Sequence, residues 1–486
     1  MTHNMINKKP SLLIALIPVI FLIVLLSVNV WIFGDDTISG SNQLTLLFAA
    51  SVAAVLGVFY KVKFKDMLDG AVESISSAMG ALIILLLIGS LAGTWMMSGI
   101  VPSMIFYGLE LLNPTIFLVA ACIICSIVSL ATGSSWSTIA TIGIAMLGIG
   151  NALGINDGLI GGAIISGAYF GDKMSPLSDT TNLAPAMAGT DLISHIKYMM
   201  WTTIPSITIT LIIFLIIGIN LEFKSGELDQ VAIMQSSLSN SFNISLWSLT
   251  VPLIVIVLII KKTPAIPALL LGAVLGGLYG VIFQPNIIQE ISGEMSNTSL
   301  QYFKNSYISI IKAMTINVDI DTQNLAVNKL ISTSGMSGML NTIWLIICAM
   351  SFGGVMEKTG FLNIITESLM KFVNSRKSLF LTTSGTCLFL NITASDQYLA
   401  IVVPGRMFAS SFKKYELDPK NLSRTLEDTA TVTSPLIPWN TCGATHAGVL
   451  GISTFIYLPY CFFNLISPIM TLIFAYGNIK IAKLRK

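Results

Sequence analysis

The sequence predicts an all-α polytopic membrane protein made of two inverted-topology repeats, with about ten crossings and two re-entrant hairpins. Of the 486 residues, 54% are hydrophobic and only 10% are charged, whereas soluble domains carry about 25% charged residues. The net charge of +2 gives no indication of a nucleic-acid partner. We therefore expect the lipid bilayer to surround most of the chain, and nothing in the sequence looks like an extramembrane domain.

Long apolar runs predict the individual spans, because a crossing helix needs about 20 apolar residues. The first run follows Lys8 and Lys9 and is long enough to cross, so we expect a retained helix rather than a cleavable signal peptide. Two short amphipathic stretches, 100–112 and 361–373, are expected to lie along opposite membrane faces. The predicted spans are 11–33, 43–62, 74–98, 199–220, 244–260, 264–283, 336–357 and 454–477.

Polar clusters interrupt four further hydrophobic stretches. Broken segments are tolerated at membrane depth where protein buries them or where they line a wet cavity. We expect the two hairpins to turn at residues 132–135 and 391–397, where the polar residues gather. The four stretches are the hairpins 115–150 and 379–411 and the broken helices 158–190 and 421–452.

Lysine and arginine in the loops predict the orientation, since they accumulate on the cytoplasmic side. Loop 148–158 has neither residue and is expected outside, whereas loop 412–424 is basic and is expected inside. The long loop 284–335 also falls outside, and both termini fall in the cytoplasm. The residues that carry these assignments are Lys8, Lys9, Asp35, Asp36, Lys413, Lys414, Lys420, Arg424 and the basic tail 480–486.

Three landmarks recur in the same order and indicate a duplicated unit. Gly360 follows Gly99 by 261 positions (360 − 99), and Thr393 follows Thr132 by the same interval (393 − 132). The tripeptide Ser-Pro-Leu starts at residue 175 and again at 434, which is 259 positions later (434 − 175). Because the charges place the two copies on opposite sides of the membrane, we expect inverted repeats spanning 1–225 and 226–486.

Three charges in one membrane stretch predict a transport site. Asp172, Lys173 and Asp179 lie within residues 171–182, and each charge near the bilayer centre costs roughly 2.5–3.5 kcal/mol on insertion scales. A site that handles ions offsets such a cost. Na⁺ is a hard cation that needs oxygen ligands, and hydroxyls, amides and the carbonyls freed at a helix break supply them.

The candidate ligands combine the two hairpin tips and the two helix breaks. Pro176, Pro435 and Pro438 are expected to free carbonyls at the breaks. The expected Na⁺ and proton ligands are Asp172, Asp179, Asp396, Ser175, Ser178, Thr180, Thr181, Asn182, Asn391, Thr393 and Ser395. Supporting roles are expected for Lys173, Thr132, Ser134, Ser135, Glu427, Asp428, Thr431, Thr433, Ser434, Asn440, Thr441 and Arg406.

Several roles stay open at this stage. Exchange against protons requires a carboxylate that can also be protonated, and Asp172, Asp179 and Asp396 each lie at a predicted break. Lys173 could balance Asp172 in the empty carrier, or the two could form a purely structural pair. Glu427 could bind an ion or start a helix near the cytoplasmic face, as could Asp428.

The remaining polar residues of interest carry further alternatives. Arg406 could pair with a carboxylate or contact an anionic co-substrate. His195 and His446 are expected to be interfacial or capping residues rather than pH sensors. We find no phosphate-binding loop, cofactor fingerprint or catalytic triad. An enzyme is therefore not expected, and neither a cofactor nor a transition metal is predicted.

The motifs around these residues resemble the signature of the NhaC family of Na⁺/H⁺ antiporters. The first is Gly167-Ala-Tyr-Phe-Gly-Asp-Lys-Met-Ser-Pro-Leu-Ser-Asp-Thr-Thr-Asn-Leu-Ala-Pro185, followed by Ala188-Gly-Thr-Asp191 and Thr202-Thr-Ile-Pro205. The second half contributes Ala394-Ser-Asp-Gln-Tyr398, Pro404-Gly-Arg406 and Ser434-Pro-Leu-Ile-Pro-Trp-Asn440. The resemblance runs along nearly the whole chain.

This resemblance implies exchange of cytoplasmic Na⁺ for external H⁺ across a bacterial plasma membrane. It also leaves a second activity open, because the family includes exchangers of malate and lactate that are coupled to Na⁺ and H⁺. The expected partners are therefore Na⁺, H⁺ and, for the second activity, small carboxylates. The sequence leaves the oligomeric state open, a homodimer included.

Overall fold

The computed structural model describes residues 10–33, 40–111, 113–221, 227–261 and 263–484. Within these ranges every regular element is a helix, and the only β-type pairing is two isolated bridges. The orientation residues Lys8, Lys9, Asp35 and Asp36 lie outside the described part of the chain. The all-α prediction is confirmed, whereas the cytoplasmic placement of the termini stays a prediction.

The helices of the first half follow one another closely. Long apolar helices come first, and a short helix, a broken hairpin and a broken helix follow. The elements are α1 (Leu12–Phe33), α2 (Ser41–Phe59), α3 (Phe64–Met97), α4 (Ile100–Leu111), α5 (Pro114–Thr132), α6 (Ser135–Thr138), the π-helical η2 (Ile139–Gly143), α7 (Ile144–Ala152), α8 (Asp157–Met174), α9 (Asp179–Ala188) and α10 (Leu192–Asn220).

The middle of the chain is also largely helical. The predicted outside loop 284–335 contains three helices, and the longest of them, α15, packs against α3. The elements are α11 (Glu227–Ser241), the 3₁₀ turn η3 (Leu246–Leu249), α12 (Thr250–Ile260), α13 (Ala265–Phe283), α14 (Pro285–Ser292), α15 (Ser299–Thr315), α16 (Leu325–Ile331) and η4 (Gly335–Met339).

The second half repeats the order long helix, short helix, broken hairpin, broken helix. Gly99 before α4 and Gly360 before α18 have φ values of 72° and 75°, so the two predicted landmarks share a left-handed turn. The elements are α17 (Leu340–Lys358), α18 (Phe361–Met370), α19 (Arg376–Thr393), α20 (Gln397–Lys414), α21 (Pro419–Leu426), the π-helical η5 (Glu427–Thr431), η6 (Ser434–Leu436), α22 (Thr441–Leu450), α23 (Thr454–Tyr457), η7 (Leu458–Tyr460) and α24 (Phe462–Tyr476).

The structure places a helix at each predicted span. Seven described helices are long and apolar enough to cross a membrane, or up to nine if each sharply bent pair is one span. The chain is therefore a multi-pass membrane protein. The two short amphipathic stretches are helices as well, namely α4 and α18. The count of ten crossings and the placement of α4 and α18 on opposite faces stay predictions.

The four predicted breaks are confirmed as interruptions of helix. Gly133, with φ 72°, ends α5, and the chain leaves α8 at Ser175 to re-enter helix at Asp179. The second hairpin breaks at residues 394–396, where Ser395 adopts φ 59°. Between η5 and α22 the chain is irregular apart from the short turn η6. Each break therefore frees backbone groups that side chains must satisfy.

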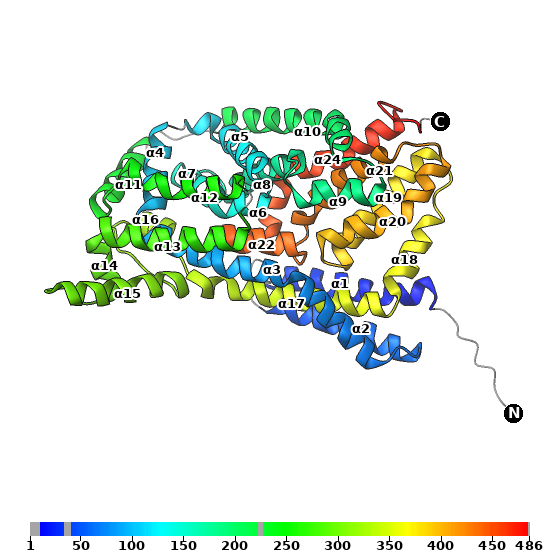
Figure 1. The fold of residues 1–486 in the computed structure, drawn as a ribbon, viewed down its shortest axis with the longest axis horizontal. Helices are drawn as coiled ribbons and strands as arrows, with labels where there is room; N and C mark the ends of the chain where they lie inside the picture. Colours follow the sequence, from blue (N-terminus) through cyan, green and yellow to red (C-terminus); the bar gives the residue numbers. More distant parts are fainter. Residues whose placement is uncertain (1–9, 34–39, 112, 222–226, 262, 485–486) are drawn as a thin grey trace.

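Two hydrophobic cores meet where these breaks lie. One core contains the first hairpin and α8, and the other contains α17 and the second hairpin. The 34-residue α3 serves both, with Leu85 in one core and Leu87 in the other. Figure 1 shows α2, α3 and α17 as a layer along one side of the block that holds α5, α8 and α24. The end of η5 also joins the cores, since Ala430 within it belongs to one and Val432 directly after it belongs to the other.

Glycines on α8 permit a close contact between α8 and α5. A side chain added at Gly167 would overlap the backbone carbonyl of Cys122, and one added at Gly171 would overlap that of Ser126. Small residues at this spacing let two membrane helices approach at backbone distance. The α5–α8 pair is therefore held as one unit, which carries the first hairpin tip and the first break.

Replacing Gly167 by valine should destabilise this unit, because overpacking a tight contact costs about 1–3 kcal/mol. The apparent melting temperature of the purified protein in detergent should fall. Gly385→Val on α19 is the matched control, since a Cβ there meets nothing within 4 Å. Equal melting temperatures for the two variants would contradict the close contact.

Candidate functional site

In the first half, the hairpin tip is bonded to the broken helix through Asp172. The Asp172 carboxylate accepts hydrogen bonds from the Ser135 hydroxyl at 2.6 Å and from the Ser135 backbone N–H at 3.2 Å. Both side chains are buried. The predicted meeting of the first tip with the first break is therefore present, with a carboxylate at its centre.

The hydroxyls after Asp172 satisfy the break itself. Thr181 donates to the carbonyl oxygens of Asp172 and Lys173 at 3.2 and 3.1 Å. Ser178 caps α9 by accepting from the Thr181 N–H, and its hydroxyl lies 3.2 Å from that of Thr180. Ser175 is buried and accepts from the N–H of Leu177. Of these four residues, Thr181 is the one that bonds to the carbonyls that the helix end releases.

In the second half, two asparagines join the tip to the break. Asn391 donates to the Ala430 carbonyl at 2.7 Å and to the Thr433 hydroxyl at 2.9 Å. Asn440 donates in turn to the side-chain and backbone oxygens of Asn391. Thr441 closes the contact by donating its N–H to the Ser395 carbonyl at 3.0 Å. Hydrogen bonds therefore join the second hairpin tip to the second helix break, as they join the first tip to the first break.

The other predicted residues of this half are buried around the same contact. Asp396 caps α20 by accepting from the Leu399 N–H at 2.8 Å. Ser395 and Thr431 are the two whose hydroxyls find no hydrogen-bond partner among the described residues. Thr393 and Ser434 each donate to a backbone carbonyl of their own helical turn, to Phe389 and Thr431 respectively.

At the first tip, Thr132 and Ser134 have local roles. The Thr132 hydroxyl lies within hydrogen-bond distance of the Ser129 carbonyl and of the Thr138 hydroxyl. Ser134 caps α6 by accepting from the Ser137 N–H. Both therefore shape the turn between α5 and α6, and Ser135 alone of the predicted tip residues bonds to Asp172.

A buried ion pair joins the two halves. Lys173 on α8 pairs with Asp428 in η5, and both side chains are fully buried. Lys173 also donates to the Ser467 hydroxyl at 3.0 Å, and Thr471 donates to the second oxygen of Asp428. The expectation that Lys173 pairs with Asp172 is therefore wrong, because Asp172 is satisfied by Ser135 and the lysine reaches across to the other half.

Glu427 and Asp428 do not lie in the first turn of α21. The helix α21 begins at Pro419, and both carboxylates follow it in η5 with no exposed surface. Neither oxygen of Glu427 has a hydrogen-bond partner among the described residues. The alternative that these two residues start a helix near the cytoplasmic face is therefore wrong, because both follow α21 and do not precede it.

Arg424, which the charge count placed in a cytoplasmic loop, lies fully buried in α21. Its guanidinium stacks on the rings of Tyr198 and Phe474, at 4.6 and 5.8 Å from the ring centroids. The two histidines are also buried rather than interfacial. His446 bonds to the Tyr169 hydroxyl at 2.8 Å, and His195 lies 2.8 Å from the Ser423 hydroxyl.

Three predicted residues do not join the buried cluster. Asp179 is exposed as the first residue of α9, and Asn182 is exposed while donating to the carbonyls of Pro176 and Ser178. Arg406 lies exposed on α20, with no ion pair to any described carboxylate. The structure therefore gathers Asp172 and Asp396, but not Asp179, among the buried carboxylates.

A large cavity, which we call the vestibule, is lined by residues at the start of α8, the opposite end of that helix from Asp172. It has a volume of about 750 Å³ and lies between α3, α4, α7, the segment 330–339 and the end of α22. Among the described residues that line it, Asp157 is the only charged one, and Asn151 and Ser332–Ser334 supply further oxygens.

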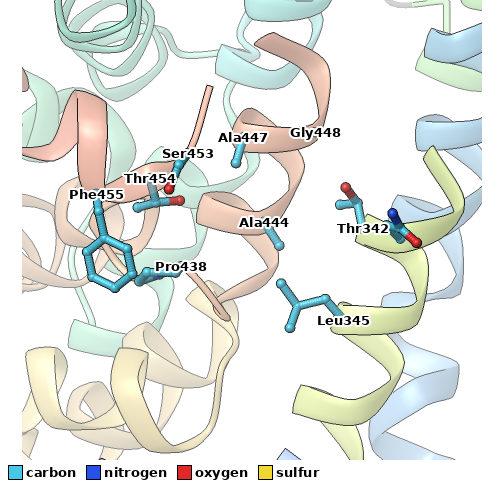
Figure 2. A pocket seen from close by; sticks show the side chains of 10 residues that line it. Thr342, Leu345, Pro438, Ala444, Ala447, Gly448, Ser453, Thr454 and Phe455 are labelled. Carbon is cyan, nitrogen blue, oxygen red and sulfur yellow. The ribbon is translucent and has the colours of Figure 1, made fainter. Parts of the chain in front are cut away.

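A smaller cavity lies between α17, α22 and the second break. It measures about 20 Å³, shares Gly448 with the vestibule and ends at Pro438. Figure 2 shows it between Thr342 and Leu345 on α17 and Ala444 on α22. The two cavities follow α22 from its exposed end to the break at which it begins.

Sequence reasoning missed the residues that complete the ion pair. Ser467 and Thr471 lie on the last apolar span, four residues apart, and the spacing places both hydroxyls on one helix face. Tyr169 lies within the first motif and is fully buried against His446. The sequence shows that Ser467 and Thr471 share one face of α24, but it does not show that this face contacts Lys173 and Asp428.

Two broken helices, each fastened to a hairpin tip and joined to one another by a buried ion pair, define a secondary membrane transporter. The comparisons with known proteins narrow this class. Residues 167–479 match the model of the Na⁺/H⁺ antiporter family, so the chain belongs to that family.

Relatives in this family match nearly the whole chain. The Na⁺/H⁺ antiporter NhaC of Alkalihalophilus pseudofirmus is 37% identical over 91% of both chains. The malate-2H⁺/Na⁺-lactate antiporter of Bacillus subtilis is 37% identical over 89% of both. The arginine/ornithine antiporter ArcD of Halobacterium salinarum is 35% identical over 98% of this chain and 93% of its own.

Removing one partner of the buried ion pair should be far more damaging than removing both. Lys173→Met and Asp428→Asn should each lower stability by about 3–5 kcal/mol, because each leaves an uncompensated buried charge. The double variant should recover much of that loss. Thermal unfolding of the purified proteins measures the loss of stability in each variant. A loss in the double variant equal to the sum of the two single losses would contradict a direct pair.

Proposed function

We propose that this protein exchanges cytoplasmic Na⁺ for external H⁺ across a bacterial plasma membrane. The observation that carries the proposal is the buried Asp172 carboxylate, held between a hairpin tip and a helix break in a member of the Na⁺/H⁺ antiporter family. A carboxylate at a helix break, surrounded by hydroxyls and freed carbonyls, supplies the oxygen ligands that Na⁺ requires.

In the proposed mechanism, Na⁺ replaces the Ser135 hydrogen bonds as the partner of Asp172. The Ser135 and Thr181 hydroxyls and the carbonyls at residues 172 and 173 lie close enough to join the coordination. The second tip, with Asn391, Ser395 and Asp396, supports the site from the other half. The Lys173–Asp428 pair keeps the two breaks together while the occupant of Asp172 changes.

The proposed architecture is a pair of inverted repeats, 1–225 and 226–486, with both termini in the cytoplasm. Support comes from the shared element order and from the matching left-handed glycines at 99 and 360. The hairpin tips and breaks then approach the same depth from opposite sides, and rocking of one unit against the other exposes the site alternately.

Exchange of small carboxylates is the second candidate function. The 37% identity with a malate/lactate exchanger favours it, whereas the lining of the vestibule favours a cation. Asp157 is the only charged residue among the described lining residues, and a cavity that carries net negative charge attracts cations and repels carboxylates. Arg406 lies exposed on α20 and does not line that cavity.

The Asp172→Asn substitution should abolish Na⁺-driven proton movement, because the neutral amide cannot balance the charge of a bound Na⁺. A pH dye inside proteoliposomes measures this flux after Na⁺ is added. Asp191→Asn is the matched control, since Asp191 is exposed and caps α10. Normal flux in Asp172→Asn would remove the first break from the site.

Organic solutes should not be required for transport. We expect Na⁺ alone to drive proton movement in proteoliposomes, with no increase of more than about twofold when malate and lactate are supplied on opposite sides. Movement that appears only with both acids present would instead establish the carboxylate exchanger.

A further inference from the structure

Glu427 is the one carboxylate among the described buried residues whose oxygens both lack a partner. It has no exposed surface, and it opens the π-helical turn η5. A buried polar group without a partner is uncommon and calls for an explanation. Single π turns inside helices are often found at functional sites. The ion pair uses Asp428, the next residue, and leaves Glu427 without an assigned task.

Two other buried groups without full partners lie on α21 or against it. All three guanidinium nitrogens of Arg424 lack a hydrogen-bond acceptor among the described residues, as does Nε2 of His195. Arg424 precedes Glu427 by three residues, and Ser423, which contacts His195, precedes it by four. Residues at these spacings are neighbours on a helix face. Arg424 and Ser423 therefore lie about one helical turn before Glu427.

We propose that Glu427 is a proton-binding residue, separate from the Na⁺ site at Asp172. This inference rests on the function proposed above and assigns its two substrates to different carboxylates. In the step, a proton from water adds to the Glu427 carboxylate to give a neutral carboxyl group. The same proton is released to water on the opposite side when the carrier returns.

The surroundings of Glu427 suit a proton and disfavour Na⁺. The charges that act on it are Lys173, Asp172 and Asp428, while the Arg424 guanidinium stacks on Tyr198 and Phe474. Na⁺ needs several oxygen ligands, and neither Glu427 oxygen has a hydrogen-bond partner among the described residues. Thr431, in the same turn, has a hydroxyl that also lacks a hydrogen-bond partner among the described residues.

The remaining elements packed against η5 add few titratable groups. His195 comes from α10, and the thiol of Cys387 comes from α19, where it lies beside Thr429. Asp179 on α9 is exposed and is not among the charges that act on Glu427. By contrast, Asp172 lies among the hydroxyls of Ser135 and Thr181 and the carbonyls of the break.

The Glu427→Gln variant tests this assignment, because glutamine keeps the shape of the protonated side chain and cannot release a proton. In proteoliposomes we expect exchange of ²²Na⁺ for unlabelled Na⁺ to stay within about threefold of the wild type. Na⁺-driven proton movement, read with an internal pH dye, should fall by at least about 100-fold. Glu427→Asp, which keeps a carboxyl group, should retain measurable proton coupling.

Two results would overturn the inference. Proton coupling that persists in Glu427→Gln shows that another group carries the proton. Loss of both Na⁺ exchange and proton movement, in a variant that elutes as the wild type does on size exclusion, shows that Glu427 belongs to a shared site. Failure of the proposed function is distinguishable, because the wild type itself would then move no protons in response to Na⁺.

Discussion

The buried ion pair between Lys173 and Asp428 is the contact on which the rest of the arrangement depends. Each charge would be too costly to leave alone in a fully buried position, so the break after α8 and the turn η5 must lie side by side. Ser467 and Thr471 complete the hydrogen bonding from α24. The pair thus fixes two distant halves of the chain at one place, and the proposed cation site adjoins it.

The same constraint explains how helix breaks are tolerated in an apolar surrounding. Each break frees carbonyls, and side chains from nearby elements satisfy them, as Thr181 does after α8 and Asn464 does for Val432 at 2.8 Å. Side-chain hydroxyls and amides donate hydrogen bonds to these carbonyls in place of the backbone N–H groups of a regular helix. A bound cation can therefore exchange with such partners at low energetic cost, which links the local chain geometry to transport.

The sequence predicted the helices and their breaks well because both follow from local patterns. Apolar runs indicate the spans, and glycine, proline and hydroxyl clusters mark Gly133, Ser175 and Ser395 as interruptions. It failed where the answer depends on pairing across the chain. The partner of Lys173 lies 255 residues away. A count of loop charges could not separate the buried Arg424 from surface lysines, and motif membership did not reveal that Asp179 is exposed.

Hydrogen–deuterium exchange of the wild-type protein, in Na⁺ and in choline, tests the central claim most directly. If Na⁺ binds between the first hairpin tip and the first break, amide exchange should slow in residues 133–136 and 172–182 when Na⁺ is present. Slower exchange elsewhere in the chain, with these two segments unchanged, would contradict the placement of the cation site at Asp172.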